Sequence, residues 1–173
     1  MKAKKLVTLA ILTILLCGCD MPKDHPKASA TKESTVKEDT VKETSVKENS
    51  MQVAVDYKTS VLDLSKELEN AMNELSTIVT KDGTLSVSKD SYKNALLYLR
   101  NVTKKYDNLK PSHDSAYKQE ETHTLILDSM KTMQDAINIQ YFSLDNLASE
   151  EFAKGLDLMN KASNKYMEAM GTL

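Results

Sequence analysis

Two cysteines near the amino terminus, Cys17 and Cys19, carry the only thiols of this 173-residue chain. They follow an uncharged, mostly apolar run, Leu6–Leu16, which is preceded by lysines. This run is shorter than the roughly 20 residues that a membrane-spanning helix needs. A basic stretch followed by a short apolar run is typical of a removable signal peptide. The chemistry predicted here is therefore modification of a cysteine sulfur at a cleavage site.

The order Leu16-Cys17-Gly18-Cys19 resembles the lipobox of bacterial lipoproteins. The resemblance implies that a diacylglyceryl group forms a thioether with Cys19 and that the chain is cut just before it. The residue ahead of the cut must be small. Gly18 satisfies this before Cys19, whereas bulky Leu16 precedes Cys17. We predict residues 1–18 as the signal peptide, Cys19 as the lipidation site and the membrane as a partner through the lipid anchor.

Three alternatives exist for the two cysteines. An ordinary secretory signal needs a small-x-small cleavage site, and none follows the apolar run clearly. A Cys17–Cys19 disulfide would be strained at this separation. A redox or metal-binding Cys-x-Cys would lie in a segment that is removed. We favour lipidation over all three.

The predicted mature chain is acidic. Removing residues 1–18 takes away three lysines and no acidic residue, so 20 basic and 25 acidic residues remain, a net charge of −5 with histidine neutral. This balance argues against nucleic acid as a partner. The chain has 22 lysines and a single arginine, Arg100. With the lipobox, this bias indicates a low-GC Gram-positive bacterium and a location on the outer face of the cell membrane.

Residues 19–50 are predicted to be a lipidated and disordered tether. Residues 20–50 contain no Leu, Ile, Phe, Tyr or Trp, so they bury too little apolar area to offset the entropy lost on ordering. A five-residue repeat places Val-Lys-Glu at 36–38, 41–43 and 46–48. A period of five matches neither a helix nor a strand. We interpret the repeat as a solvated spacer rather than a ligand-binding motif.

Residues 51–173 are predicted to form an all-α, up-down antiparallel bundle of about four helices. Apolar residues recur at steps of three and four, and short connections favour antiparallel neighbours. The expected helices span about 52–80, 88–110, 112–145 and 146–170. Their apolar stripes include Val61, Leu68 and Leu75; Ala95, Leu99 and Val102; His123, Leu127, Met130 and Ile137; and Leu156, Met159 and Tyr166.

Local signals mark the ends of these helices. Gly83 is expected to end the first helix in the left-handed conformation. Ser88 is expected to cap the second helix, and Pro111 to end it. Ser112 is expected to start the third helix, and a weak break at Asp145-Asn146 leads into the fourth.

Motifs for catalysis or cofactor binding are not evident in the sequence. It has no Gly-rich phosphate loop, no His-x-x-x-His and no serine-nucleophile motif. We therefore predict no enzyme activity, no catalytic residue, no cofactor and no metal site.

The three histidines lie in different parts of the chain. His25 lies in the predicted tether, and His113 is expected in the first turn of the third helix beside Asp114. His123 lies on or beside the apolar stripe. It is either a ligand or proton handler inside the bundle, or a packed histidine bonded to a neighbouring helix. We favour the packed histidine.

Residues 51–173 contain seven methionines, including the pairs Met130/Met133 and Met167/Met170. Thioethers can bind copper(I), but methionine also fills irregular cores. Most of these residues recur at helical spacing on apolar faces. We therefore favour core filling.

The segment Leu109-Lys110-Pro111, followed by Tyr117 and His123, resembles the inter-helix segment of small helical-bundle lipoproteins of Gram-positive bacteria. In that family a Leu-x-Pro turn precedes a tyrosine and a histidine. The likeness covers about residues 95–130. This chain has one proline where such turns often have two, and its Tyr–His spacing is longer. The resemblance implies the architecture, and no activity.

These observations predict a membrane-anchored, extracytoplasmic binding module with an envelope protein among its candidate partners. The alternative is a small-ligand or metal carrier that uses the bundle interior. An exposed apolar patch would favour a partner, whereas a buried polar cavity around His123 would favour a ligand.

Overall fold

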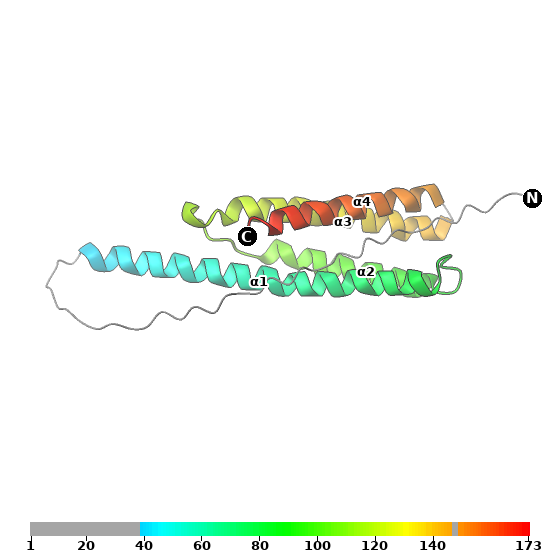
Figure 1. The fold of residues 1–173 in the computed structure, drawn as a ribbon, viewed down its shortest axis with the longest axis horizontal. Coiled ribbons are helices and arrows are strands. Elements are labelled where there is room, and N and C mark those ends of the chain that lie inside the picture. Colours follow the sequence, from blue (N-terminus) through cyan, green and yellow to red (C-terminus); the bar gives the residue numbers. More distant parts are fainter. Residues whose placement is uncertain (1–38, 147–148) are drawn as a thin grey trace, which may run out of the picture. The chain divides into compact units, whose positions relative to one another are not determined.

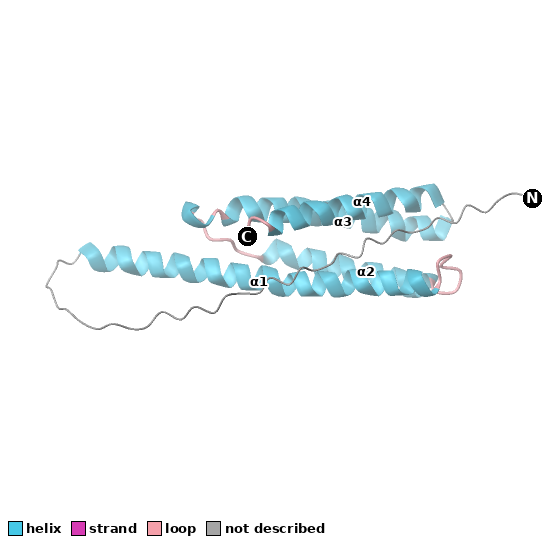
Figure 2. Cartoon of the chain, viewed as in Figure 1, coloured by secondary structure: helices cyan, strands magenta, loops and turns pink. Residues whose placement is uncertain are grey.

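Four α-helices make up most of the residues that the computed structural model describes, which are residues 39–146 and 149–173 (Figures 1 and 2). The helices are α1 (Asp39–Lys81), α2 (Lys89–Lys105), α3 (Gln119–Asn146) and α4 (Ser149–Met170), with two 3₁₀ turns, η1 (Tyr106–Asn108) and η2 (Ser115–Tyr117), between α2 and α3. These two ranges contain no strand. The predicted signal peptide, Cys19 and residues 20–38 lie outside the described residues.

Helices that follow one another along the chain pack against each other: α1 against α2, α2 against α3, and α3 against α4. The members of each pair are antiparallel, as Figure 1 shows. α1 also reaches α4 through side-chain hydrogen bonds, although these two helices approach each other less closely. The predicted all-α bundle is confirmed.

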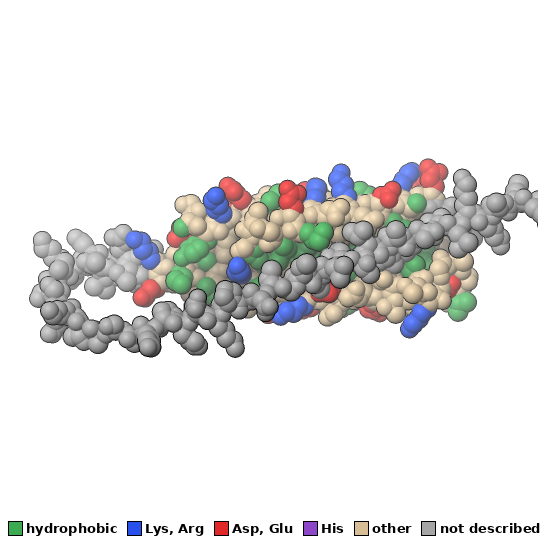
Figure 3. Space-filling model, in the orientation of Figure 1, with side chains coloured by type: hydrophobic (Ala, Val, Ile, Leu, Met, Phe, Trp, Pro, Cys, Tyr) green, Lys and Arg blue, Asp and Glu red, His purple; other side chains and the backbone are tan. Residues whose placement is uncertain are grey.

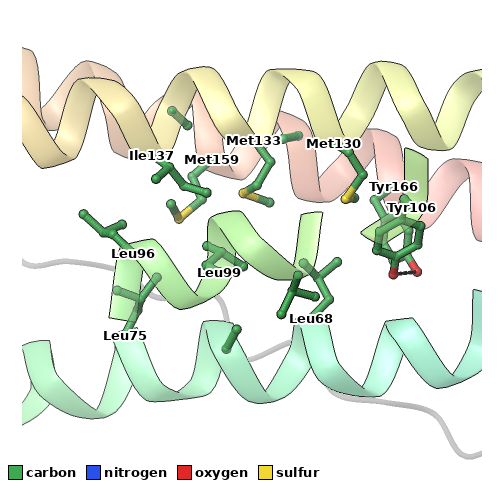
Figure 4. Packing of buried hydrophobic residues seen from close by; sticks show 14 of the residues in the cluster. Leu68, Leu75, Leu96, Leu99, Tyr106, Met130, Met133, Ile137, Met159 and Tyr166 are labelled. Atoms are coloured by element: carbon green, nitrogen blue, oxygen red, sulfur yellow. Dashed lines mark hydrogen bonds between the residues drawn. The ribbon is translucent and has the colours of Figure 1, made fainter. Parts of the chain in front are cut away.

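All four helices contribute apolar side chains to one core (Figure 4). Its members include Leu68 and Leu75 of α1, Leu96 and Leu99 of α2, Met130, Met133 and Ile137 of α3, and Met159 and Tyr166 of α4. The stripes predicted for the first two helices are confirmed. In α3 the buried line runs through Ile126 and Met130, while His123 and Leu127 are half-buried at its edge. Leu156 is likewise half-buried.

α1 begins at Asp39, so the predicted helix start near Gln52 is wrong, and the helix extends into the segment predicted to be a tether. Lysine and glutamate are good helix formers, and this stretch contains neither glycine nor proline. Once packing has formed the later turns, adding each further residue to the helix costs little free energy. The helix therefore continues into the repeat, although a period of five matches no helix face. Figure 1 shows this part of α1 extending beyond the ends of the other helices.

The turn between α1 and α2 is built by Asp82 rather than by Gly83. The Asp82 carboxylate accepts hydrogen bonds from the backbone N–H groups of Val87 (2.8 Å) and Ser88 (2.9 Å). These bonds lower the pKa of Asp82. Leu85, whose side chain is buried, takes the left-handed conformation with a φ of 52°. No described glycine has a positive φ, so the predicted Gly83 cap is wrong.

α3 begins at Gln119, seven residues after the predicted start at Ser112. The Asp114 carboxylate caps the η2 turn, and Lys118 then has a φ of 50°, which no α-helix accommodates. Gln119 holds the connection in place. Its side chain accepts the N–H of Ser112 at 3.0 Å and donates to the carbonyl of Ala54 at 2.7 Å.

The remaining boundaries lie close to their predicted positions. Ser88 occupies the N-cap position of α2 without a side-chain capping bond. η1 continues α2 to Asn108, shortly before Pro111. α3 ends at Asn146 and α4 begins at Ser149, so the third and fourth helices are separate.

Small residues bring α3 and α4 together. A Cβ atom at Gly155 would lie 2.5 Å from Cγ of Gln140 and 3.2 Å from the carbonyl oxygen of Ala136. Ser129 of α3 donates to the carbonyl of Ala162 at 2.8 Å. Both contacts require backbones that approach closely, so the α3–α4 interface depends on the size of these residues.

The core predicts the cost of truncating a leucine. Leu99 has no exposed surface, and Leu99→Ala should lower the free energy of unfolding by about 2–5 kcal/mol. Leu62 is 44% exposed, and Leu62→Ala should change it by no more than about 0.5 kcal/mol. Urea unfolding followed by circular dichroism measures both. Equal effects of the two variants would contradict the packing described.

The α3–α4 contact predicts that Gly155→Ala destabilises the bundle. Overpacking typically costs about 1–3 kcal/mol, and the new methyl group would displace Gln140, which accepts a hydrogen bond from Tyr92 at 2.5 Å. Gly83→Ala is the matched control, because its Cβ would have no neighbour closer than 3.7 Å. Thermal unfolding should show a lower Tm for Gly155→Ala and an unchanged Tm for Gly83→Ala.

Candidate functional site

Polar side chains gather inside one end of the bundle, where α1, η1, α3 and α4 meet. They are Tyr57, Ser65, Tyr106, His123 and Tyr166. Sequence analysis singled out only His123 among them. The tyrosines lie among aliphatic residues of the helices. The sequence pattern therefore does not show whether a tyrosine hydroxyl is buried or half-exposed.

Three hydroxyl groups form a chain across the core. Tyr106 and Tyr166 lie 2.8 Å apart through their hydroxyl oxygens, as Figure 4 shows, and Tyr166 lies 2.5 Å from Oγ of Ser65. Ser65 uses its own proton to bond the carbonyl of Val61 at 2.9 Å. These hydrogen bonds connect η1, α4 and the backbone of α1.

Burial keeps these phenols neutral. It raises the pKa of Tyr106, and the neighbouring Tyr166 adds to this effect. Burial is also the largest cause of the raised pKa of Tyr166. A neutral, fully bonded hydroxyl chain joins helices, and it supplies no acid or base near neutral pH.

His123 pairs with Tyr57 across the interface of α3 and α1. The Tyr57 hydroxyl and Nδ1 of His123 are 3.4 Å apart, and the two rings meet edge to face with centroids 5.7 Å apart. Burial raises the pKa of Tyr57 to about 12. Burial also lowers the pKa of His123, against the opposing effect of Asp107. A neutral His123 with its proton on Nε2 can accept a hydrogen bond from the Tyr57 hydroxyl at Nδ1, as expected for a packed histidine bonded to a neighbouring helix.

The described side chains offer no ready metal site. No three His, Cys, Asp or Glu residues within the described ranges lie close enough to hold a metal ion. Every buried side-chain nitrogen or oxygen there has a hydrogen-bond partner. Met130 and Met133 are buried among leucines in the core, so core filling is confirmed for this pair, whereas Met167 is 42% exposed.

The other histidines lie elsewhere. His113 is exposed in the connection before α3, where its Nδ1 contacts the Glu120 carboxylate. Its predicted place in the first turn of the third helix is wrong, because that helix begins at Gln119. His25 and Cys19 lie outside the described residues.

Sequence analysis missed one surface feature. Met51, Val55 and Leu62 of α1 are exposed, and we call these three residues the α1 flank. They are four and seven residues apart and lie beside the buried stripe rather than in it. Their helical spacing was a usable signal for an exposed apolar arc beside the core stripe. In the part of the chain that the structure describes, no helix is both long and apolar enough to cross a membrane.

Comparison with protein-family models, curated proteins and solved structures yields no match. Function is therefore inferred from the residues of this chain.

The His123–Tyr57 pair predicts a stability that depends on pH. Because folding lowers the pKa of His123 below its ordinary 6.5, the unfolded chain binds the proton more tightly. The stabilisation is present above about pH 6.5, and it is lost as the pH falls through the lowered pKa that His123 has in the folded chain. Urea unfolding between pH 7.5 and pH 5 should show this loss in the wild type and not in His123→Gln.

His113→Gln is the control for that experiment, since His113 is exposed. It should keep the loss of stability at low pH. The same loss in His123→Gln would show that another group is responsible.

Proposed function

We propose that this protein is a bacterial lipoprotein of the outer face of the cell membrane, in which the helical bundle acts as a non-catalytic binding module. The Leu16-Cys17-Gly18-Cys19 order supports the anchor. The α1 flank carries the binding role, because large apolar side chains are exposed on a bundle whose buried polar groups are satisfied internally.

The proposed anchor would hold the chain at a membrane, and within residues 39–146 and 149–173 no helix could span one. A single acyl chain binds a bilayer only marginally, and stable attachment takes two. A diacylglyceryl group on Cys19 supplies both. From Asp39 to Lys81, α1 is 43 residues long and covers about 65 Å at about 1.5 Å per residue. The first turns of α1, which extend beyond the ends of the other helices (Figure 1), would act as a spacer between the anchored segment and the bundle.

Binding is favoured over catalysis by the state of the polar residues. The tyrosines and His123 bond to one another across helix interfaces. Asp82 is committed to its turn through two backbone N–H groups. The hydrogen bonds of these groups stabilise the fold, so these groups are not positioned to bind a substrate or to transfer a proton.

The alternative is a carrier that uses the Tyr57–His123 pair or the core methionines. Binding of copper or zinc to the native state would raise the Tm, and His123→Ala or Met130→Leu would abolish that rise. We place this function second, because the side chains concerned already pack against one another.

The anchor is tested at the two cysteines. Cells grown with radioactive fatty acid should label the wild type and Cys17→Ala, and should leave Cys19→Ala unlabelled. Cys19→Ala should be released from the membrane or remain unprocessed, because it lacks the sulfur that forms the thioether. Label retained by Cys19→Ala would refute the assignment.

A further inference from the structure

We draw no further inference here: the strongest candidate, the α1 flank, is one of several surface patches where hydrophobic side chains are exposed (Figure 3), and nothing in the structure shows what covers it.

Discussion

The close approach of α3 and α4 is the contact on which the packing of the other helices depends. Gly155 leaves room for Gln140 and for the backbone at Ala136. Gln140 can then accept the Tyr92 hydroxyl of α2 while its amide lies 3.7 Å from the sulfur of Met159. A larger residue at position 155 would move Gln140 and loosen α2 as well as α4, because the same amide serves both helices.

α1 is attached in a different way. It packs along α2, but it reaches α4 mainly through the hydroxyl groups of Ser65 and Tyr166. Long side chains that meet at their tips hold two backbones further apart than glycine and alanine do. The α1 flank lies on the exposed side of this helix.

The polar interior has a structural role in this arrangement. Tyr106, Tyr166 and Ser65 join η1, α4 and α1 through hydrogen bonds between their hydroxyl groups. Burial raises the pKa of these phenols, so their bonds persist across the ordinary pH range. Burial lowers the pKa of His123, so protonation of this residue disfavours the folded state. The proposed anchor would place this sensitivity outside the cytoplasm, where the surrounding pH varies.

The amino-acid sequence by itself determined the helical class and the stripes of α1 and α2, but it left open whether the third and fourth helices are separate or one broken helix. Steps of three and four follow from the geometry of the helix alone, and Pro111 acts on its immediate neighbours. The start of α1 at Asp39 was missed, because a period of five argues only against burial and not against continuation of a helix already formed.

Only the tertiary structure decided the turns and the contacts between helices. Leu85 takes the left-handed conformation in place of Gly83 because its side chain gains a place in the core and Asp82 bonds the backbone beyond it. The partnership of Tyr57 with His123 joins residues 66 positions apart. Such pairings depend on the distances between helices. All the interface residues determine these distances together through their sizes, and no local sequence pattern contains that information.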